Sequence, residues 1–549
     1  MDGLFTSLAD SLGASVDQIK LITCLLVSYP LGSVFVRVPS VGLKHVFNIS
    51  VTLLYLLAML NMFNAFLQLL LDILVTYYLA KGMTDKRMPW LVFIFVMGHL
   101  LINHIIRAFF DLSYETVEVT GPQMVLVMKL TTFAWNVYDG RRSAEELDKW
   151  QLERRVTDQK FPSLLAFLGY TFYFPGFLVG PFLEYAEYDA LVTEKLFKSA
   201  TPPRHLHDPS FVPKRLLPSG RKRVGYFKLV TGLVYLGLFV TLYGKFSFAE
   251  TLKPWFGRIT LVERLFFFQI AGFFERCKYY AIWTLTEGAA IITGLGFTGY
   301  NDEGRTLWDG AANIRVLNIE FAENFKMLLD SWNMKTNVWL RECIYKRVAK
   351  KGAKPGFKSS MMTFTVSAIW HGVSPGYYLT FVFGGFVTTA ARLVRSAVRP
   401  LLIPVPGQPT TSPSFNKRIY DWSGVVLTAM LMNYAAAPFM LLTVENTLKC
   451  FSRVAWYGYI IVGGSLFFFY AGGTRALKRA QAKRVKNYQD RLADEKERER
   501  EREESVNGTI YETEGGSGAA TPSSSDETHV VPPIALVAEE FEKHHEKIL

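Results

Sequence analysis

A single histidine, His371, lies in an apolar run of residues 363–386, with Trp370 and Gly372 as its neighbours. Pro375 follows shortly afterwards and favours a break in the helix at this point. A buried imidazole tends to stay neutral and can then take a proton from a substrate group, which is the task of a general base. A structural hydrogen-bonding role is the alternative for a lone buried histidine. His371 is the strongest catalytic candidate in the chain.

The segment 331–347 (SWNMKTNVWLRECIYKR) is too polar for a helix that faces lipid, yet it contains large apolar residues for packing. Asn333, Lys335, Asn337 and Arg341 are its candidates for facing a protein interior. Polar side chains at membrane depth are costly, so they tend to face a cavity or a partner. We therefore expect these residues to line a cavity, with an amphipathic helix at the membrane interface as the alternative.

A basic run separates this segment from His371. It consists of Lys346, Arg347, Lys350, Lys351, Lys354 and Lys358. Such a run is typical of a solvated cytosolic loop that follows the positive-inside rule. It is also suited to be a rim that binds the phosphate groups of an anionic cofactor.

Two other catalytic interpretations are weaker. Residues 372–376 match the G-x-S-x-G pattern of hydrolases, which has meaning only between a strand and a helix with acid and histidine partners downstream. Here the pattern joins two apolar segments, so we reject it. The four cysteines form no C-x-x-C pair, so we expect neither a disulfide framework nor a metal site. Cys343 would be a nucleophile only in a different mechanism.

Three further histidines have simpler interpretations. His99 and His104 are five residues apart, which places them on different faces of a helix, and we expect both to pack in the core or at an interface. His45 precedes an apolar block and is expected in a loop.

The elements that position these residues must cross a membrane. Half of the 549 residues are hydrophobic, and they are gathered in blocks. A helix needs about 20 residues to cross roughly 30 Å of hydrocarbon, and several blocks are shorter, which favours tilted, paired or re-entrant segments. The blocks are residues 21–35, 49–67, 69–80, 90–110, 163–183, 227–242, 261–274, 279–297, 361–370, 377–391, 425–442 and 455–470. We predict an all-α polytopic membrane protein with about ten or eleven transmembrane helices, plus re-entrant or amphipathic helices around an intramembrane catalytic chamber.

The net charge of +12 comes from basic residues beside the apolar blocks and in the C-terminal tail. This placement indicates contact with anionic headgroups rather than with nucleic acid. The six basic residues between 475 and 486 follow the last block and predict a cytosolic C-terminus. The N-terminus lacks a basic region with a small-residue cleavage site, so the first span is expected to act as the targeting signal.

We divide the chain into a membrane domain, residues 1–473, and a charged, largely disordered cytosolic tail, residues 474–549. Within the tail, residues 481–502 favour a helix. Residues 515–528 are rich in Gly and Ser, cannot form a core and are expected to be disordered. The sequence shows neither internal repeats nor paired carboxylates in its apolar blocks, which argues against a transporter.

Two motifs resemble the membrane-bound O-acyltransferase family. The family pattern is an asparagine or histidine in the context W-N/H-x-x-x-x-x-W, followed some tens of residues later by a histidine in an apolar W-H-G context. Here the first motif is Trp332 and Asn333 with Trp339, and the second is residues 370–372.

The surrounding sequence resembles the lysophospholipid acyltransferase branch, and most of all its fungal members of broad specificity. Residues 28–32 (SYPLG), 177–185 (FLVGPFLEY) and 285–314 are similar to that branch, as is the pattern from Trp332 onwards. The resemblance spans residues 28–391 and extends to 473.

The resemblance implies acyl transfer inside the membrane. Acyl-coenzyme A would be a co-substrate rather than a bound cofactor, and no metal would be needed. His371 would take the proton from the free glycerol hydroxyl, at sn-2, of a lysophospholipid. Asn333 would position a reactant or donate a hydrogen bond to the developing charge. The residues expected to bind substrate are Trp332, Lys335, Asn337, Trp339, Trp370, Lys346 and Arg347.

The resemblance also implies a multi-pass protein of the endoplasmic reticulum membrane that acts in phospholipid synthesis and remodelling. Another acceptor within the family, a sterol or a diacylglycerol, is the first alternative. A non-enzymatic transporter, with Asn333 and His371 lining a permeation path, is the second. No local motif encodes the headgroup preference, the acyl-chain preference or the oligomeric state.

Overall fold

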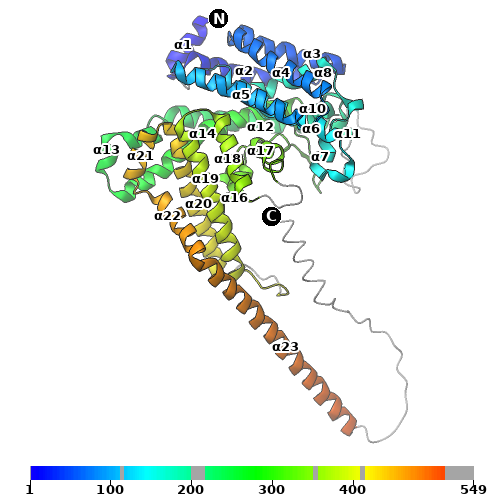
Figure 1. The fold of residues 1–549 in the computed structure, drawn as a ribbon, viewed down its shortest axis with the longest axis vertical. Helices are drawn as coiled ribbons and strands as arrows, with labels where there is room; N and C mark the ends of the chain where they lie inside the picture. Colours follow the sequence, from blue (N-terminus) through cyan, green and yellow to red (C-terminus); the bar gives the residue numbers. More distant parts are fainter. Residues whose placement is uncertain (1, 112–115, 199–216, 350–355, 409–413, 514–549) are drawn as a thin grey trace. The chain divides into compact units, whose positions relative to one another are not determined.

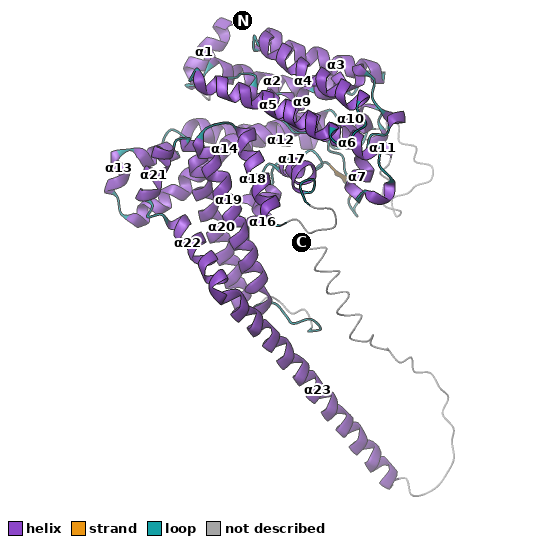
Figure 2. Cartoon of the chain, viewed as in Figure 1, coloured by secondary structure: helices purple, strands orange, loops and turns teal. Residues whose placement is uncertain are grey.

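The computed structural model describes residues 2–111, 116–198, 217–349, 356–408 and 414–513. In these ranges the chain consists of helices, loops and one short antiparallel pair of strands (Figure 2). The strands are β1 (Gly299–Tyr300) and β2 (Thr306–Leu307), and Gly299 pairs with Leu307. The predicted all-α fold is confirmed. The chain divides into two units, residues 1–481 and 482–549.

Eight helical segments within the described ranges are long and apolar enough to cross a membrane. They are Val16–Phe35, Val41–Met59, Phe63–Gly82, Met88–Phe109, Arg221–Leu242, Pro375–Leu401, Phe415–Leu441 and Tyr457–Glu504. Large apolar side chains on these helices, such as Ile94 and Phe109, are exposed, as residues that face lipid must be. The prediction of a polytopic membrane protein is therefore confirmed.

The predicted count of ten or eleven spans exceeds these eight, because apolar content alone does not separate one crossing from the next. Residues 261–274 and the part of 279–297 up to residue 292 belong to one 32-residue helix, α14 (Leu261–Ile292), rather than to two helices. Residues 163–183 form two short helices, α8 (Leu164–Thr171) and α9 (Phe174–Phe177), which together are too short for a straight crossing.

The N-terminal helices are shown in blue and cyan in Figure 1. The first of the spans begins with a capping box. The Ser15 hydroxyl accepts from the Gln18 N–H, and the Gln18 Oε1 accepts from the Ser15 N–H. The helices are α1 (Asp2–Leu12), α2 (Val16–Phe35), α3 (Val41–Leu53) with its π-helical continuation η1 (Leu54–Met59), α4 (Phe63–Gly82), α5 (Met88–Phe109) and α6 (Thr120–Gly140).

Short helices connect α6 to the C-terminal half, and α8 and α9 are among them. The others are η2 (Ala144–Glu146), α7 (Lys149–Arg154), η3 (Asp158–Lys160), α10 (Tyr185–Val192) and α11 (Lys195–Lys198).

The C-terminal half contains the predicted site, and its helices α18, α19 and α20 lie side by side in Figure 1. Up to the site the helices are α12 (Arg221–Leu242), η5 (Phe248–Leu252), α13 (Pro254–Arg258), α14, α15 (Val316–Glu320), α16 (Phe325–Ser331), α17 (Met334–Leu340) and the π-helical η6 (Arg341–Tyr345). After it come α18 (Phe357–His371), α19 (Pro375–Ala397), η7 (Arg399–Leu401), α20 (Phe415–Leu441), α21 (Val444–Arg453), α22 (Tyr457–Phe468), η8 (Phe469–Gly473) and α23 (Thr474–Thr513).

Two large apolar cores stabilise the unit of residues 1–481. The first gathers side chains from the N-terminal helices and also contains Trp339 and Trp370. The second gathers side chains from the C-terminal helices, and Trp332 packs against it. Asn333 therefore lies where the chain passes from one core to the other.

Helix α6 is a central helix that the apolar blocks did not predict. Seventeen of its 21 residues are buried. They include Lys129, whose ammonium group donates to the carbonyl oxygens of Tyr170 and Thr171 at 3.3 and 3.1 Å. Protein rather than lipid surrounds this helix, and buried polar groups are tolerated when they are hydrogen-bonded.

His45 is not a loop residue, contrary to our expectation. It lies in α3, it is buried, and its Nδ1 is 2.8 Å from the Tyr188 hydroxyl. The helix begins at Val41, capped by the Ser40 hydroxyl, earlier than the apolar block suggests.

The second unit contains most of α23, which extends from Thr474 to Thr513. The prediction of a helix over residues 481–502 is confirmed. Residues 515–528, for which we predict disorder, lie outside the described residues.

Candidate active site

Helix α18 ends at His371. Gly372 terminates the helix with a φ of 136°, a conformation that favours glycine, while its N–H donates to the Ala368 carbonyl oxygen at 3.1 Å. Pro375 occupies the first position of α19, where a missing N–H leaves no helical hydrogen bond unmade. The predicted break is confirmed, and it places the imidazole at the end of a helix.

Four aromatic rings surround the His371 imidazole. The ring centroids of Trp370, Phe439, Phe381 and Tyr377 lie 4.7, 4.9, 5.2 and 5.8 Å from its own. Within the part of the chain that the structure describes, no group hydrogen-bonds either ring nitrogen. An apolar surrounding favours the neutral imidazole, and its nitrogens are available to a reactant.

The close approach of α19 and α20 brings Phe439 to this cage. The Gly376 N–H donates to the Leu442 carbonyl oxygen at 2.7 Å. A Cβ at Gly376 would collide with the Pro438 carbonyl oxygen, so a side chain at this position would separate the two helices. The glycine that follows Pro375 therefore allows the aromatic cage to close.

His104 of α5 contacts the same helix end. Its Nε2 lies 3.2 Å from the carbonyl oxygen of Trp370, the residue before His371. His99, on the other side of α5, has its Nδ1 at 2.7 Å from the buried Asp72 carboxylate. The two histidines thus lie on different helix faces and pack in the interior, as predicted.

Asn333 lies immediately before α17 in a left-handed conformation, with φ 43° and ψ 53°. Asparagine tolerates this conformation better than most residues. Asn313 holds the turn, since its carbonyl oxygen accepts from the Met334 N–H at 2.8 Å and its Oδ1 accepts from the Lys335 N–H at 3.0 Å.

The side-chain amide of Asn333 is oriented by two donors. Its Oδ1 accepts from Asn313 Nδ2 at 3.1 Å and from the Thr336 hydroxyl at 2.9 Å. The Nδ2 group makes no hydrogen bond within the described ranges. The Oδ1 atom of the amide therefore bonds within the protein, and its Nδ2 group can donate to another molecule.

The two candidate segments meet through tryptophans. The rings of Trp339 in α17 and Trp370 in α18 have their centroids 5.8 Å apart. The indole of Trp370 donates to the Met124 carbonyl oxygen at 2.9 Å, and that of Trp339 donates to the Thr131 hydroxyl at 2.9 Å. Both acceptors belong to α6, so this helix holds the two segments against each other.

Three of the predicted substrate-binding residues have partners within the fold. Trp332 packs against Tyr279 and Trp283 of α14, with centroids 5.6 and 5.3 Å apart. Asn337 donates from Nδ2 to the Leu329 carbonyl oxygen at 2.9 Å. These contacts are structural and do not support a role in substrate binding. The Lys335 ammonium lies 3.5 Å from a Glu187 carboxylate oxygen.

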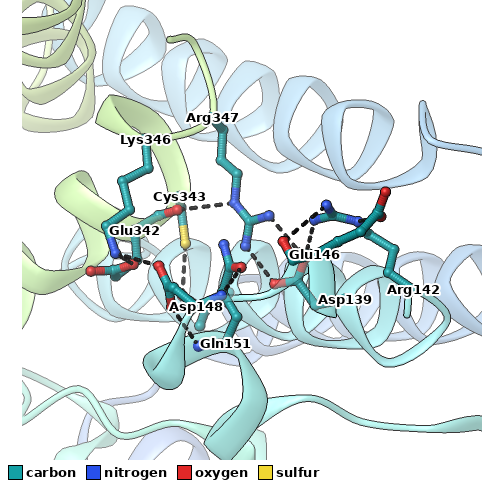
Figure 3. Close-up of polar contacts among 10 residues, drawn as sticks. Asp139, Arg142, Glu146, Asp148, Gln151, Glu342, Cys343, Lys346 and Arg347 are labelled. Carbon is teal, nitrogen blue, oxygen red and sulfur yellow. Dashed lines mark hydrogen bonds and ion pairs between the residues drawn. The ribbon is translucent and has the colours of Figure 1, made fainter. Parts of the chain in front are cut away.

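Arg347 is buried against α6, as Figure 3 shows. Its two terminal nitrogens donate to the Asp139 carboxylate at 2.9 and 2.5 Å, and its Nε donates to the Glu342 carbonyl oxygen at 3.1 Å. Because the guanidinium makes these hydrogen bonds within the fold, the predicted role of Arg347 in phosphate binding has no support here.

Lys346 is less committed than Arg347. Its ammonium pairs with Asp148 at 2.8 Å and with Glu342 at 2.7 Å, and its side chain remains 34% exposed. It remains a candidate for phosphate binding. Lys350, Lys351 and Lys354 of the basic run lie outside the described residues.

Cys343 is fully buried in η6, where its sulfur contacts the Thr132 hydroxyl at 3.4 Å. Burial raises the pKa of the Cys343 thiol to about 12. A thiol in this state supplies almost no thiolate near neutral pH, so the geometry gives no support to a cysteine nucleophile.

Two residues in this site were not selected from the sequence as functional. Asn313 supports Asn333 from 20 residues upstream, within the stretch 285–314. His104 belongs to no motif, and the only feature of the sequence that could have indicated it is a histidine within an apolar helix. Together the site offers a neutral imidazole in an apolar cage and an oriented amide donor, which suits proton transfer with stabilisation of a developing oxyanion.

Comparison with known proteins agrees with the motifs. The model of the MBOAT, or membrane-bound O-acyltransferase, family matches residues 106–434, which include Asn333 and His371. The lysophospholipid acyltransferase of Schizosaccharomyces pombe is 39% identical over 467 residues, which cover 84% of this chain and 88% of that protein. The lysophospholipid acyltransferase of Saccharomyces cerevisiae is 36% identical over 481 residues, or 85% and 76% of the two chains. Human membrane-bound glycerophospholipid O-acyltransferase 2 is 30% identical over 463 residues, or 83% and 84%.

Proposed function

The chain belongs to the membrane-bound O-acyltransferase family, and from this premise we propose that it transfers a fatty acyl chain from acyl-coenzyme A to the free glycerol hydroxyl, at sn-2, of a lysophospholipid. The similarity to two proteins named lysophospholipid acyltransferase over most of the chain supports this acceptor. The observation that carries the proposal is the His371 imidazole, which lies at a helix end in an aromatic cage without a hydrogen-bond partner among the described residues.

His371 acts as the general base in this proposal. One ring nitrogen takes the proton of the acceptor hydroxyl as the hydroxyl oxygen attacks the thioester carbonyl carbon. The new C–O bond forms, the C–S bond breaks, and the proton passes from the imidazolium to the departing thiolate of coenzyme A. The imidazole is then neutral again, and no acyl-enzyme intermediate is required.

Asn333 stabilises the negative charge that develops on the thioester oxygen. Its Nδ2 group is the available donor, and its Oδ1 is fixed by Asn313 and Thr336. A donor that is already oriented needs no reorganisation during the reaction, and its effect is greater where the dielectric is low. The four aromatic rings around His371 make the surroundings of the imidazole apolar, which lowers the dielectric there.

The substrates are proposed to enter an intramembrane chamber from different sides. Acyl-coenzyme A would come from the cytosol. Lys335 and Lys346, which pair with carboxylates but keep 18% and 34% of their side chains exposed, are the candidates to contact its phosphates. The lysolipid would come from the bilayer. We place the protein in the endoplasmic reticulum membrane, as the family resemblance implies. The six basic residues between 475 and 486, which follow the last apolar segment, support a cytosolic C-terminus.

The proposal is tested in microsomes that contain equal amounts of wild-type protein or His371→Ala, supplied with acyl-coenzyme A and a panel of lysolipids. Thiol release and acylated product are both followed. The variant should lose transfer by at least about 100-fold. His99→Gln is the matched control, because it changes a histidine whose ring contacts Asp72 instead of the cage.

Two outcomes would contradict the proposal. Unchanged transfer by a folded His371→Ala protein would show that another group is the base. Transfer by the wild type to a sterol or a diacylglycerol, with no lysolipid acylated, would show that the acceptor is wrong while the family chemistry holds.

A further inference from the structure

One face of α6 contacts the segment α17–η6 along its whole length. The residues on the segment side, 336, 339, 343 and 347, follow helical spacing, and they meet residues 128, 131, 132 and 139 of α6 in the same order. Spacings of three and four residues place side chains on one helix face. Asn333 lies at the start of this segment, and Arg347 follows its end.

Two of these four contacts are weakly directional. The Thr336 hydroxyl lies 3.3 Å from the Met128 sulfur, and the Thr132 hydroxyl lies 3.4 Å from the Cys343 sulfur. Contacts to sulfur are soft and tolerate a displacement along the helix. The apolar packing around them is non-directional too. The Trp339 indole N–H, which donates to the Thr131 hydroxyl at 2.9 Å, adds one directional hydrogen bond near the middle of α17–η6. A second directional contact at the far end is needed to fix the register along the whole segment.

The contact between Asp139 and Arg347 is of a different kind (Figure 3). The guanidinium and the carboxylate form two parallel hydrogen bonds, at 2.9 and 2.5 Å. The Asp139 side chain is fully buried, and the Arg347 side chain is 7% exposed. The guanidinium also lies 4.3 Å from the centre of the Trp135 ring. A planar pair of this geometry is directional and is lost when one partner shifts along the helix.

Arg347 also holds the end of η6. Its Nε donates to the carbonyl oxygen of Glu342, one turn earlier. The Arg347 side chain therefore bonds both to the backbone of the π-helical turn and to α6. Because α17 and η6 are continuous, a displacement at this end is transmitted along the helix to Asn333.

We propose that Asp139 and Arg347 are positioning residues, whose ion pair fixes the register of α17–η6 on α6 and thereby places the Asn333 Nδ2 group for the reaction. This inference rests on the role proposed above for Asn333. In this proposal the pair acts through Asn333 and does not bind substrate itself. Its loss therefore lowers kcat more than it raises the KM for the lysolipid.

A double-mutant cycle tests the proposal in membranes that contain the full chain. Asp139→Asn, Asn333→Ala and the double variant are compared with the wild type for kcat, KM and the amount of folded protein. Asp139→Asn should lower kcat about 10- to 100-fold, because a displacement of about 1 Å misaligns the donor. In the Asn333→Ala background the same change should lower kcat by less than about twofold, since the donor it positions is already absent.

Two further variants complete the experiment. Arg347→Lys keeps the positive charge but removes the paired geometry, and it should show a smaller loss of kcat with the same dependence on Asn333. It serves as the second test if Asp139→Asn does not fold. Glu153→Gln is the control, since Glu153 of α7 pairs with Lys149 and Arg154 and belongs to none of the contacts between α6 and η6 given above, and it should behave as the wild type.

The possible failures are distinguishable. Equal losses of kcat from Asp139→Asn in both backgrounds, or no loss in either, would overturn the positioning role and leave the role of Asn333 intact. Wild-type kcat in Asn333→Ala itself would overturn the role of Asn333, and the positioning role with it.

Discussion

The indole rings of Trp339 and Trp370 pack with their centroids 5.8 Å apart, and this contact joins the helix that follows Asn333 to the helix that ends at His371. Each indole N–H is also bonded to α6. Helix α6 thus supports the segments of both Asn333 and His371, the two residues proposed to carry the reaction. The contribution of each residue is tested by its own substitution.

Asn333 can be separated into its backbone and side-chain roles. Asn333→Gly keeps the left-handed conformation and removes the amide, whereas Asn333→Asp keeps the shape and removes the Nδ2 donor. Both variants should lower kcat about 100-fold, because one oriented donor to an oxyanion is lost. Steady-state acyl transfer measures the effect. Wild-type activity of Asn333→Gly would mean that the residue matters only for its turn.

His104 should support the end of α18. His104→Leu removes the hydrogen bond to the Trp370 carbonyl oxygen and should lower the free energy of unfolding by about 1 kcal/mol. Turnover should fall as well, because the carbonyl belongs to the residue before His371. Thermal inactivation in detergent measures the stability. His104→Gln retains a donor, so it should restore part of both properties, and equal effects of Leu and Gln would contradict this account.

Cys343 should be dispensable for the chemistry. Cys343→Ala removes a buried thiol whose pKa is about 12, and the folded variant should keep its turnover. Acyl transfer and a search for a hydroxylamine-sensitive acyl-protein check this expectation together. A loss as severe as that of His371→Ala, with a trapped acyl group in the wild type, would instead indicate a cysteine nucleophile.

Phe439 should keep water away from His371. Phe439→Leu leaves a gap in the aromatic cage, so acyl-coenzyme A hydrolysis without an acceptor should rise relative to acyl transfer. The ratio of free fatty acid to acylated lipid measures this change. Phe467→Leu alters an exposed phenylalanine on α22 and should leave the ratio at its wild-type value.

The sequence predicted the elements of the site better than their surroundings. The break at Gly372 and Pro375 followed from local chain chemistry alone, and the structure contains it. The cage around His371 did not, because Phe439 comes from α20 and reaches the ring only through the close approach at Gly376. Contacts between residues far apart in the chain leave no periodic pattern that a single sequence can reveal.

Helix α6 shows why hydropathy fails for an interior helix. A window that detects lipid-facing spans passes over Lys129, Thr131 and Asn136, whose polar groups lower its mean hydropathy. Burial also explains why the phosphate-binding role predicted for Arg347 has no support. We expected Arg347 at a phosphate-binding rim because its neighbours in the sequence are basic. Its partner Asp139 lies 208 residues earlier, and the pattern of charges along the sequence does not predict that the two residues pair.

The π-helical turn η6 determines how the chain length between Asn333 and Arg347 can vary. A π-helical turn contains one residue more than an α-helical turn, so deleting one residue between Arg341 and Tyr345 would restore an α-helical turn and keep Arg347 facing Asp139. An insertion would rotate Arg347 by about 100° relative to α17, and away from Asp139. Relatives that share this pairing should therefore accept a one-residue gap here but no added residue.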